Sequence, residues 1–419
     1  MSRRQNTLLL TGATDFLGKV VLAELLRLQA GYSVGMIILL VCRTETLDAQ
    51  QCFHQAAKTG CFANLRLSWS GLVRVEEADL TRVHCGLKDE DYNRICSRVT
   101  HIIHASGYEK SNGDIHEAMS ADIDGSLNIL ALAKDCPGLR QLVVTSTAFV
   151  APPRDGPIYE ELVKLPKRAD ALVADLRSHR ITQSDALTLT GHPNVYTLSK
   201  CLTEHMLDQK REYLALTIVR PSIVCAALDY PSPGWVDSTA AFAGFVLGFA
   251  SGGLKAFNGH RKAKLDIVPV DKVADCLIAE AFRYNERGTG RSQTRIVFSV
   301  ATTAQSLTLE DSCRIMELYF GGLEFQYIGT TRLAFEINHL IYHHLRLNIC
   351  ATIGRLRGNH EKAEESKKAL EQVRVVIADF AAYAAKSHDF FPKEPVIGFN
   401  VEDYLRLIFD GVKVNLMHG

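Results

Sequence analysis

The feature that most constrains this chain is a short β-type run followed at once by a glycine-containing turn and an amphipathic stretch. The run is Thr7 to Leu10, the turn is TGATDFLG from Thr11 to Gly18, and apolar residues recur at helical spacing from Lys19 to Leu28. A helix that begins within such a turn points backbone N–H groups and the positive end of its dipole at a pyrophosphate. The pattern predicts a strand, a phosphate-binding loop and a helix, and a turn without a ligand is the alternative interpretation.

Further strands are expected at intervals along the first half of the chain. They are Met36–Val41, Val73–Glu77, His101–His104, Gln141–Thr145 and Leu216–Val219. Helical patterns lie between most of them, including Thr197 to Leu214. Strands that alternate with helices predict an α/β fold of the Rossmann type, with a doubly wound parallel sheet.

The composition changes along the chain suggest three parts. Residues 1–230 are expected to form mainly the dinucleotide-binding domain, and residues 231–329, richer in Gly and Pro, a substrate-binding part interleaved with it. Residues 330–419 have a strongly helical pattern that closes with Val401 to Val414, and they are expected to form a C-terminal helical domain.

Charge and cysteine content exclude several classes of function. Lys plus Arg and Asp plus Glu both number 47, so no long-range field attracts nucleic acid, which we exclude as a partner. The 11 cysteines form no CxxC pair and no signal-like segment follows Met1, so we expect reduced thiols, no metal, and a cytoplasmic or peripheral organelle-membrane location. The longest apolar stretch, Thr239 to Ala250, is shorter than the roughly 20 residues of a membrane-spanning helix.

Positions in and after the loop bear on the cofactor. Asp15 stands where the usual TGxxGxxG pattern has its middle glycine, so a carboxylate would repel the phosphates. Arg43 follows the second strand and suits a 2′-phosphate, which favours NADPH over NADH, although an ordinary surface arginine is the alternative. Asp79 and Leu80 follow the third strand, where such folds hold the adenine ring, but Asp79 also suits a turn cap.

A second motif supplies candidate catalytic groups. Tyr196 and Lys200 have the spacing YxxxK, which places both side chains on one face of a helix. The lysine is expected to lower the pKa of the phenol, which would protonate a carbonyl that receives hydride. Ser146 and Thr147 follow the fifth strand, at the edge where ligands bind. Because YxxxK also arises by chance in helices, its position after the loop and five strands is what makes it a candidate site.

These motifs together resemble the fatty acyl-CoA reductase family, the relatives of male-sterility proteins and thioester reductase domains within the extended short-chain dehydrogenases. The resemblance covers most of the chain. It rests on six segments, namely TGATDFLGKV (Thr11–Val20), STAFV (Ser146–Val150), HPNVYTLSK (His192–Lys200), IVRPSIV (Ile218–Val224), PGWVD (Pro233–Asp237) and DIVPVDKVAD (Asp266–Asp275).

The resemblance implies an oxidoreductase with Thr147, Tyr196 and Lys200 as its catalytic residues. It implies that NADPH contacts the phosphate loop, the carboxyl ends of the strands and the catalytic helix, through Gly12, Thr14, Asp15, Phe16, Leu17, Gly18, Arg43, Asp79, Leu80, Ala105, Tyr196, Lys200, Pro221 and Ile223. Asp122 departs from the family pattern, which has an asparagine that supports a proton relay to the lysine, and an aspartate there would add a charge near Lys200.

The implied reaction is NADPH-dependent reduction of a fatty acyl-CoA to aldehyde, alcohol or both. The apolar run Phe242 to Phe257 could line an acyl channel or form a buried helix, and these interpretations have equal weight. Leu340 to Arg346 could touch a membrane surface, but its moderate amphipathicity favours packing. The tail His388 to Phe409 resembles the family's closing segment more loosely, and this similarity does not bear on the chemistry.

Three other functions fit parts of the sequence. The first is a reductase of acyl chains carried by phosphopantetheine on a carrier protein. The second is an NADP-binding regulator without turnover, which Asp15 and Asp122 favour and the intact Thr147, Tyr196 and Lys200 oppose. The third is a sugar-nucleotide or steroid enzyme, which the PGWVD segment disfavours.

Overall fold

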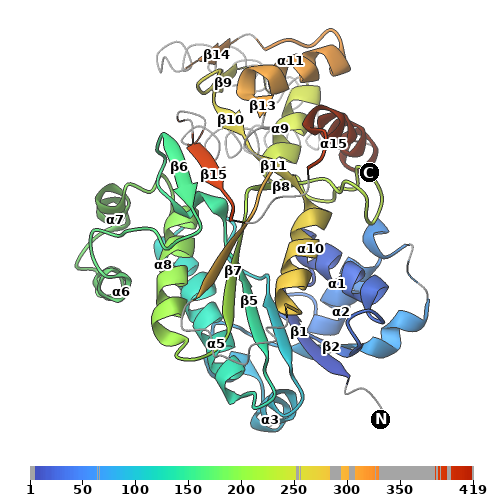
Figure 1. Cartoon of the computed structure of the whole chain (residues 1–419), viewed down its shortest axis with the longest axis vertical. Helices are drawn as coiled ribbons and strands as arrows, with labels where there is room; N and C mark the ends of the chain where they lie inside the picture. Colours follow the sequence, from blue (N-terminus) through green and yellow to red (C-terminus); the bar gives the residue numbers. More distant parts are fainter. Residues whose placement is uncertain are drawn as a thin grey trace, which may run out of the picture.

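A seven-stranded parallel sheet forms the centre of the computed structural model (Figure 1). The structure describes residues 5–63, 65, 67–251, 254, 256–283, 294–301, 307–325, 327–329, 383, 386, 388–393 and 398–417. The sheet strands are β1 (Asn6–Thr11), β2 (Val34–Val41), β3 (Val73–Glu77), β4 (His101–His104), β5 (Gln141–Thr145), β7 (Leu216–Pro221) and β12 (Arg295–Ser299). Their order is β12-β7-β5-β4-β1-β2-β3, and every neighbouring pair is parallel. The strand order therefore reverses between β1 and β4, which is where such sheets bind ligands.

Six of these strands were predicted from the sequence, and the predicted Rossmann-type fold is confirmed. The seventh, β12, was assigned to the substrate-binding part instead. It pairs with β7 in register, Ile296 opposite Ile218. The five residues of β12, RIVFS, do not reveal the partner strand, because that pairing joins segments far apart in the chain.

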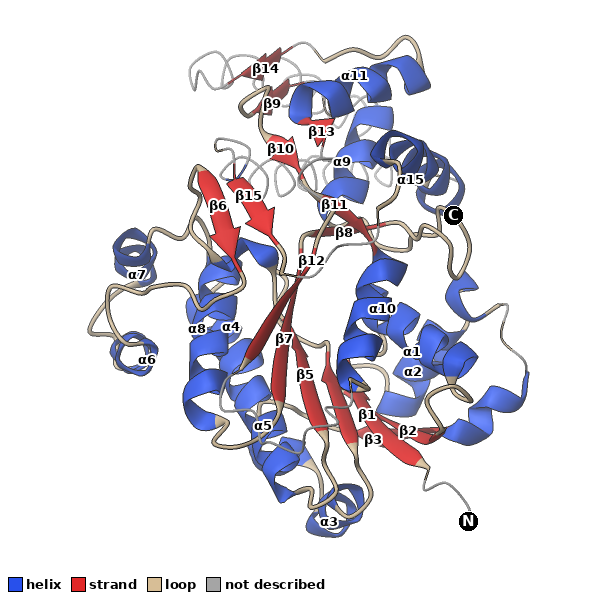
Figure 2. Cartoon of the chain, in the orientation of Figure 1, coloured by secondary structure: helices blue, strands red, loops and turns tan. Residues whose placement is uncertain are grey.

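Helices cover both faces of the sheet (Figure 2). One face packs against α1 (Phe16–Leu28), α2 (Ala49–Ala57) and α10 (Val270–Ala281). The other packs against α3 (Asp89–Cys96), α5 (Gly125–Asp135) and α8 (Val195–Lys210). Alternate residues of β1 serve the two layers: Leu8 and Leu10 face the first and Leu9 the second. Both faces are thus buried, which explains why the strands are continuous apolar runs.

The other elements form the rim of the sheet and a second body beyond the carboxyl ends of its strands. The short strands are β6 (Gly156–Tyr159), β8 (Ile223–Cys225), β9 (Ala256–Asn258), β10 (Lys264–Leu265), β11 (Ile267–Pro269), β13 (Leu307–Thr308), β14 (Tyr327–Gly329) and β15 (His388–Phe391). The helices are α4 (Ile115–Ala118), a π-helical turn (Met119–Asp124), α6 (Ala169–Arg177), α7 (Gln183–Thr190), α9 (Ala241–Ala250), α11 (Leu309–Phe320) and α15 (Val401–Leu416). Short 3₁₀ helices lie at Gly60–Phe62, Leu67–Leu72, Val83–Gly86 and Ala148–Val150.

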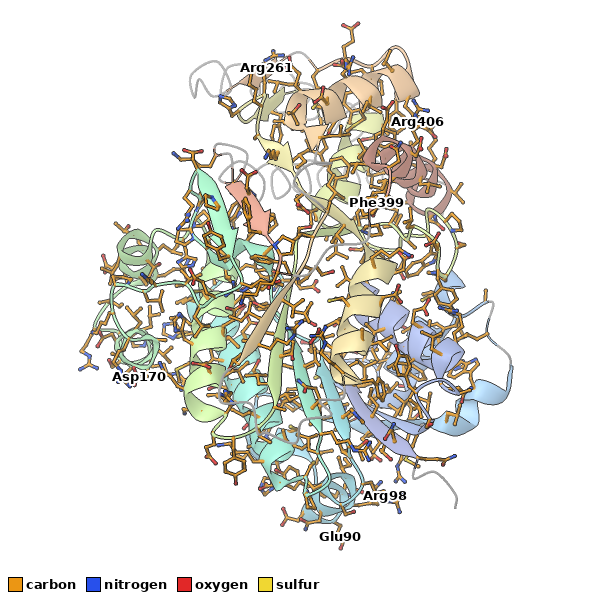
Figure 3. All side chains as sticks on the ribbon, viewed as in Figure 1. Glu90, Arg98, Asp170, Arg261, Phe399 and Arg406 are labelled. Carbon is orange, nitrogen blue, oxygen red and sulfur yellow. The ribbon has the colours of Figure 1, made fainter. Side chains whose placement is uncertain are left out.

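The second body has its own apolar core, built from α9, α11 and α15. Charged side chains cover its outside, as Arg261 and Arg406 show in Figure 3. The predicted closing helix is α15, and its Tyr404 hydroxyl donates to the Ala226 carbonyl at 2.6 Å. Residues 330–382, with most of the predicted C-terminal helical domain and the stretch Leu340 to Arg346, lie outside the described residues.

Among the described helices, none has the length and apolar character needed to cross a membrane.

Two glycines let α15 touch the loop before α9. A Cβ placed on Gly411 of α15 would lie 1.8 Å from the Gly234 carbonyl oxygen, and one on Gly234 would lie 2.8 Å from the Leu407 carbonyl oxygen. Gly234 also has a φ of +78°, a conformation that other residues rarely adopt.

We expect Gly411→Ala to destabilise the protein by about 1–3 kcal/mol, because the new methyl group must displace backbone. Thermal unfolding should show a lower Tm. Gly71→Ala is the matched control, since a Cβ there would meet nothing within 4 Å. Equal Tm values for the two variants would show that α15 does not depend on this contact.

Candidate active site

The phosphate loop has the backbone geometry that its sequence predicts. Gly12 has a φ of +75°, and a Cβ on it would lie 2.8 Å from the Ala105 carbonyl carbon. A Cβ on Gly18 would lie 1.9 Å from the Gly12 carbonyl oxygen. Both positions therefore require glycine, so that α1 and the loop after β4 can approach β1 closely.

Asp15 occupies the N-cap position of α1, but its side chain forms no hydrogen bond to the first turn of the helix. The first-turn amides of the helix can thus meet an anionic ligand. The φ of Asp15 is −91°, so the replacement of glycine costs no backbone strain. Its effect is electrostatic, since burial and the nearby Glu109 carboxylate raise the pKa of Asp15 to about 6, with Lys19 acting in the opposite direction.

A buried histidine, which the sequence analysis did not single out, joins the two strands at the switch point. His104 Nδ1 lies 2.7 Å from Thr11 Oγ1, and its Nε2 lies 3.1 Å from Ser126 Oγ. Thr11 Oγ1 also accepts the Ser106 N–H at 3.2 Å. Burial lowers the pKa of His104 to about 3, so the ring is neutral and binds the ends of β1 and β4 together.

The three predicted catalytic side chains meet in one cavity of about 550 Å³. Thr147 comes from the segment after β5, and Tyr196 and Lys200 from the first half of α8. The helix begins where it does because the Asn194 side chain accepts the Thr197 N–H at 2.9 Å. Lys200 Nζ lies 5.8 Å from the centroid of the Tyr196 ring, so the YxxxK spacing does bring the two groups together.

Asp122 is the direct partner of Lys200. Its carboxylate, in the π-helical turn, accepts hydrogen bonds from Lys200 Nζ at 2.9 Å, Ser199 Oγ at 2.5 Å and the Tyr108 N–H at 2.8 Å. The side chains of Asp122 and Lys200 are only 1% and 11% exposed. A Cβ on Gly107 would lie 2.2 Å from Lys200 Nζ, so glycine leaves the room for this pair. The charge that the sequence placed near Lys200 is thus a buried ion pair.

The ion pair of Asp122 with Lys200 affects the pKa values of the two catalytic groups Tyr196 and Lys200. Burial raises the pKa of the Tyr196 phenol; Lys200 lowers it and Asp122 raises it. Lys200 lowers the pKa of Tyr196 as predicted, but burial has the larger effect and the net shift is upward. Burial by itself would lower the pKa of Lys200, yet Asp122 reverses this and the pKa is raised. The lysine is therefore held as a cation and the phenol as a proton donor.

A second buried ion pair contacts Ser146, the residue before Thr147. Arg220 binds Glu204 through two hydrogen bonds, of 2.9 Å and 2.5 Å, and Ser146 Oγ donates to the same carboxylate at 2.6 Å. This network ties the ends of β5 and β7 to α8. The sequence analysis missed Glu204, although it follows Lys200 by one helical turn and belongs to the same helix as both catalytic residues.

The predicted cofactor residues separate into two groups. Nine of them line the cavity, namely Thr14, Asp15, Phe16, Leu17, Ala105, Tyr196, Lys200, Pro221 and Ile223. Outside its lining lie Gly12, Gly18, Arg43, Asp79 and Leu80. Together these residues fit a nicotinamide dinucleotide, with first-turn amides for the pyrophosphate and an extended surface at the ends of β2 and β3 for the adenosine.

Two acidic residues, Glu77 and Asp79, bear on the predicted contacts with the adenosine of NADPH. Arg43 is well exposed and lies 3.7 Å from Glu77, a carboxylate at the end of β3 that the sequence analysis did not consider. Asp79 accepts hydrogen bonds from the N–H and hydroxyl of Thr81, so it caps the turn, as the alternative interpretation held.

The C-terminal part of the chain contributes two side chains to the wall of the cavity. Tyr383 and His388 line it, and the Tyr383 hydroxyl donates to the Phe149 carbonyl at 2.8 Å. β15 pairs in parallel with β6, placing the tail beside the segment that follows Thr147. From α9, Ala241 and Ala243 also line the cavity.

Comparisons with known proteins agree with the resemblance found in the sequence. An NAD-binding family model described as Male sterility protein matches residues 10–277. Fatty acyl-CoA reductase wat of Drosophila melanogaster is 29% identical over 279 residues, covering 65% of this chain and 53% of the relative. Fatty acyl-CoA reductase 1 of Mus musculus is 26% identical over 356 residues, covering 80% and 66%. The chain thus spans about half to two thirds of the length of these relatives.

Solved structures with low sequence identity share the fold. The terminal R domain of the myxalamid PKS-NRPS biosynthetic pathway has a TM-score of 0.67 at 18% identity, covering 99% of this chain and 92% of that domain. UDP-glucuronic acid 4-epimerase from Bacillus cereus, solved with NAD, has a TM-score of 0.59 at 12% identity, covering 98% and 99%.

We expect Asp15→Asn to bind NADPH about tenfold more tightly than the unchanged protein at about pH 8 and equally at about pH 5, because the raised pKa makes the carboxyl neutral in acid and repulsive to pyrophosphate above about pH 6. Fluorescence titration at each pH measures the difference. Comparing the two proteins at the same pH cancels ionisation of the 2′-phosphate. An affinity ratio that does not change with pH would show that Asp15 does not face the phosphates.

Proposed function

Since the chain belongs to the male sterility protein family, we propose that it reduces a fatty acyl thioester, with NADPH as the hydride donor and acyl-CoA as the substrate. The observation that carries this proposal is the convergence of Thr147, Tyr196 and Lys200 in one cavity beside the phosphate loop. The curated relatives are fatty acyl-CoA reductases, which supports the thioester as substrate.

Thr147, Tyr196 and Lys200 have separate roles in the reduction. Thr147 and Tyr196 donate hydrogen bonds to the thioester carbonyl oxygen, where negative charge develops. Tyr196 gives its proton to that oxygen, and Lys200, held as a cation by Asp122, stabilises the phenolate that remains. Bound NADPH supplies the hydride to the carbonyl carbon. Collapse of the adduct breaks the carbon–sulfur bond and releases a thiol and an aldehyde, and a second hydride and proton convert the aldehyde to an alcohol.

The cavity also offers an apolar surface to the acyl chain. Val236, Ala241 and Ala243 line it from the loop and helix beyond the sheet, and Leu265 lines it from β10. The phenylalanines of α9, such as Phe242 and Phe245, belong to the buried core behind them. In this proposal the small residues of α9 face the acyl chain while the large ones hold the helix.

The preference for NADPH rests on Arg43. Its guanidinium is exposed at the carboxyl end of β2, where the 2′-phosphate of the adenosine would lie. Glu77, 3.7 Å away, is only a loose partner, so it leaves donors of Arg43 for a phosphate.

The direct test is to incubate the protein with NADPH and palmitoyl-CoA, follow the absorbance of reduced nicotinamide and analyse the extracted lipids. We expect hexadecanal, hexadecanol or both, and a loss of at least about 100-fold in kcat for Tyr196→Phe, because the proton donor is removed. NADH in place of NADPH tests the cofactor preference. The ratio of NADPH consumed to product formed separates reduction by one hydride from reduction by two.

Other results of this experiment would favour one of the alternative functions. Turnover only with an acyl carrier protein thioester would identify a carrier-dependent reductase. NADPH binding without turnover on any thioester would favour a regulator. Unchanged turnover in Tyr196→Phe would remove Tyr196 from the mechanism.

The ion pair at Lys200 predicts a shift in the pH profile. Asp122 raises the pKa of Tyr196 and of Lys200, so in Asp122→Asn both groups should lose their protons at lower pH. Tyr196 is active when protonated, and Lys200 when charged. We therefore expect the alkaline limb of kcat/KM to move to lower pH.

Ser199→Ala is the matched control for this experiment. It removes a neutral hydrogen-bond donor to Asp122 and leaves the carboxylate charge in place. Its alkaline limb should stay where it is in the unchanged protein. An alkaline limb that stays in place or moves upward in Asp122→Asn would contradict the role given to the charge.

A further inference from the structure

A third ion pair lies in the wall of the cavity, apart from the catalytic groups. Lys19, directly after Gly18 in α1, pairs with Asp237 of the PGWVD segment, and both residues line the cavity. Their side chains are 10% and 21% exposed. A pair that is largely shielded from water contributes little to stability, because desolvation offsets most of its attraction. Its place in the wall of a ligand cavity suggests another role.

One carboxylate oxygen of Asp237 has no hydrogen-bond donor among the described residues. Asp237 Oδ2 binds the Lys19 ammonium, whereas Oδ1 is buried and has no hydrogen-bond partner among the described residues. A buried carboxylate oxygen without a donor is unfavourable, so such an atom beside a cavity is suited to a donor brought by a ligand.

The surrounding structure holds the pair in place. Trp235 stacks on Phe16 of α1, with ring centroids 5.6 Å apart. On its other side the loop carrying Asp237 touches α15 through Gly234 and Gly411. The Trp235 carbonyl accepts the Ala227 N–H at 2.9 Å. The pair is thus positioned before a ligand arrives, which lowers the entropic cost of binding.

An ammonium beside a carboxylate presents hydrogen-bond donors and an acceptor side by side. This arrangement complements a secondary amide, whose carbonyl accepts and whose N–H donates. It suits neither an alkyl chain nor a phosphate, since Asp237 would repel the latter. Within the proposed function, the thioester carries such amides in the pantetheine arm next to its sulfur. We propose that Lys19 and Asp237 bind an amide of the pantetheine arm and so position the thioester carbonyl at Tyr196.

The test uses three thioesters of octanoic acid that differ only in the thiol. Coenzyme A carries the full arm, N-acetylcysteamine keeps one amide, and ethanethiol has none. Steady-state kinetics with each are measured for the unchanged protein, Asp237→Ala and Lys19→Met, together with the KM for NADPH. Lys134→Met, which breaks the surface ion pair with Glu212, is the control for loss of a charge.

The unchanged protein should prefer the N-acetylcysteamine thioester to the ethyl thioester by about 10- to 100-fold in kcat/KM, the range for a hydrogen bond to a charged group. Asp237→Ala and Lys19→Met should lose this preference and react with the ethyl thioester within about twofold of the unchanged protein. The KM for NADPH should not change in Asp237→Ala, whereas Lys19 also acts on the Asp15 carboxyl of the phosphate loop, so Lys19→Met is compared on the thioesters alone. Lys134→Met should behave as the unchanged protein does.

Three results would overturn the inference. The first is equal reactivity of the ethyl and N-acetylcysteamine thioesters in the unchanged protein, a measurement that needs no variant. The second is a loss of kcat/KM in the two variants that is equal for every thioester. The third is a higher KM for NADPH in Asp237→Ala, which would assign the pair to the carboxamide of the nicotinamide. Absence of turnover on all three thioesters in the unchanged protein would instead refute the proposed function, so the two failures are distinguishable.

Discussion

The parallel pairing of the seven strands determines where everything else in this molecule can lie. Because their carboxyl ends share one edge, the loops after β1, β4, β5 and β7 open toward the same crevice. His104 strengthens this edge at the switch point by joining Thr11 to Ser126 within the core. The phosphate loop and the hydroxyl of Thr147 are neighbours for this reason, although more than a hundred residues separate them in the chain.

Charges in and beside this crevice occur in pairs. Lys200 with Asp122 and Arg220 with Glu204 are buried, and Lys19 with Asp237 is partly buried. A single buried charge would be costly, whereas a pair with further hydrogen bonds is tolerated. Asp122 is therefore compatible with a working site, since it accepts three hydrogen bonds and keeps the lysine charged. The site gains fixed charges without gaining net charge.

The C-terminal part of the chain is integrated with the site. α15 packs against α9 in the second core and supports the loop that carries Asp237, and Tyr383 binds the backbone beside Thr147. A looser sequence resemblance in this region thus does not mean a lesser role. The resemblance rests on sequence motifs, whereas these contacts depend on close packing. They are the approach of Gly411 to Gly234 and the hydrogen bond from the Tyr383 hydroxyl to the Phe149 carbonyl.

Local patterns in the sequence determined the strand, loop and helix at the start of the chain, six of the seven sheet strands, and the YxxxK pair on α8. Each depends on residues within about a dozen positions of one another, where periodicity and turn chemistry act directly. Only the tertiary structure decided that β12 completes the sheet, that Asp122 pairs with Lys200, that Glu77 lies beside Arg43 and that Asp237 meets Lys19. These contacts join segments distant in the chain, and their geometry follows from how helices and strands pack, which no local pattern records.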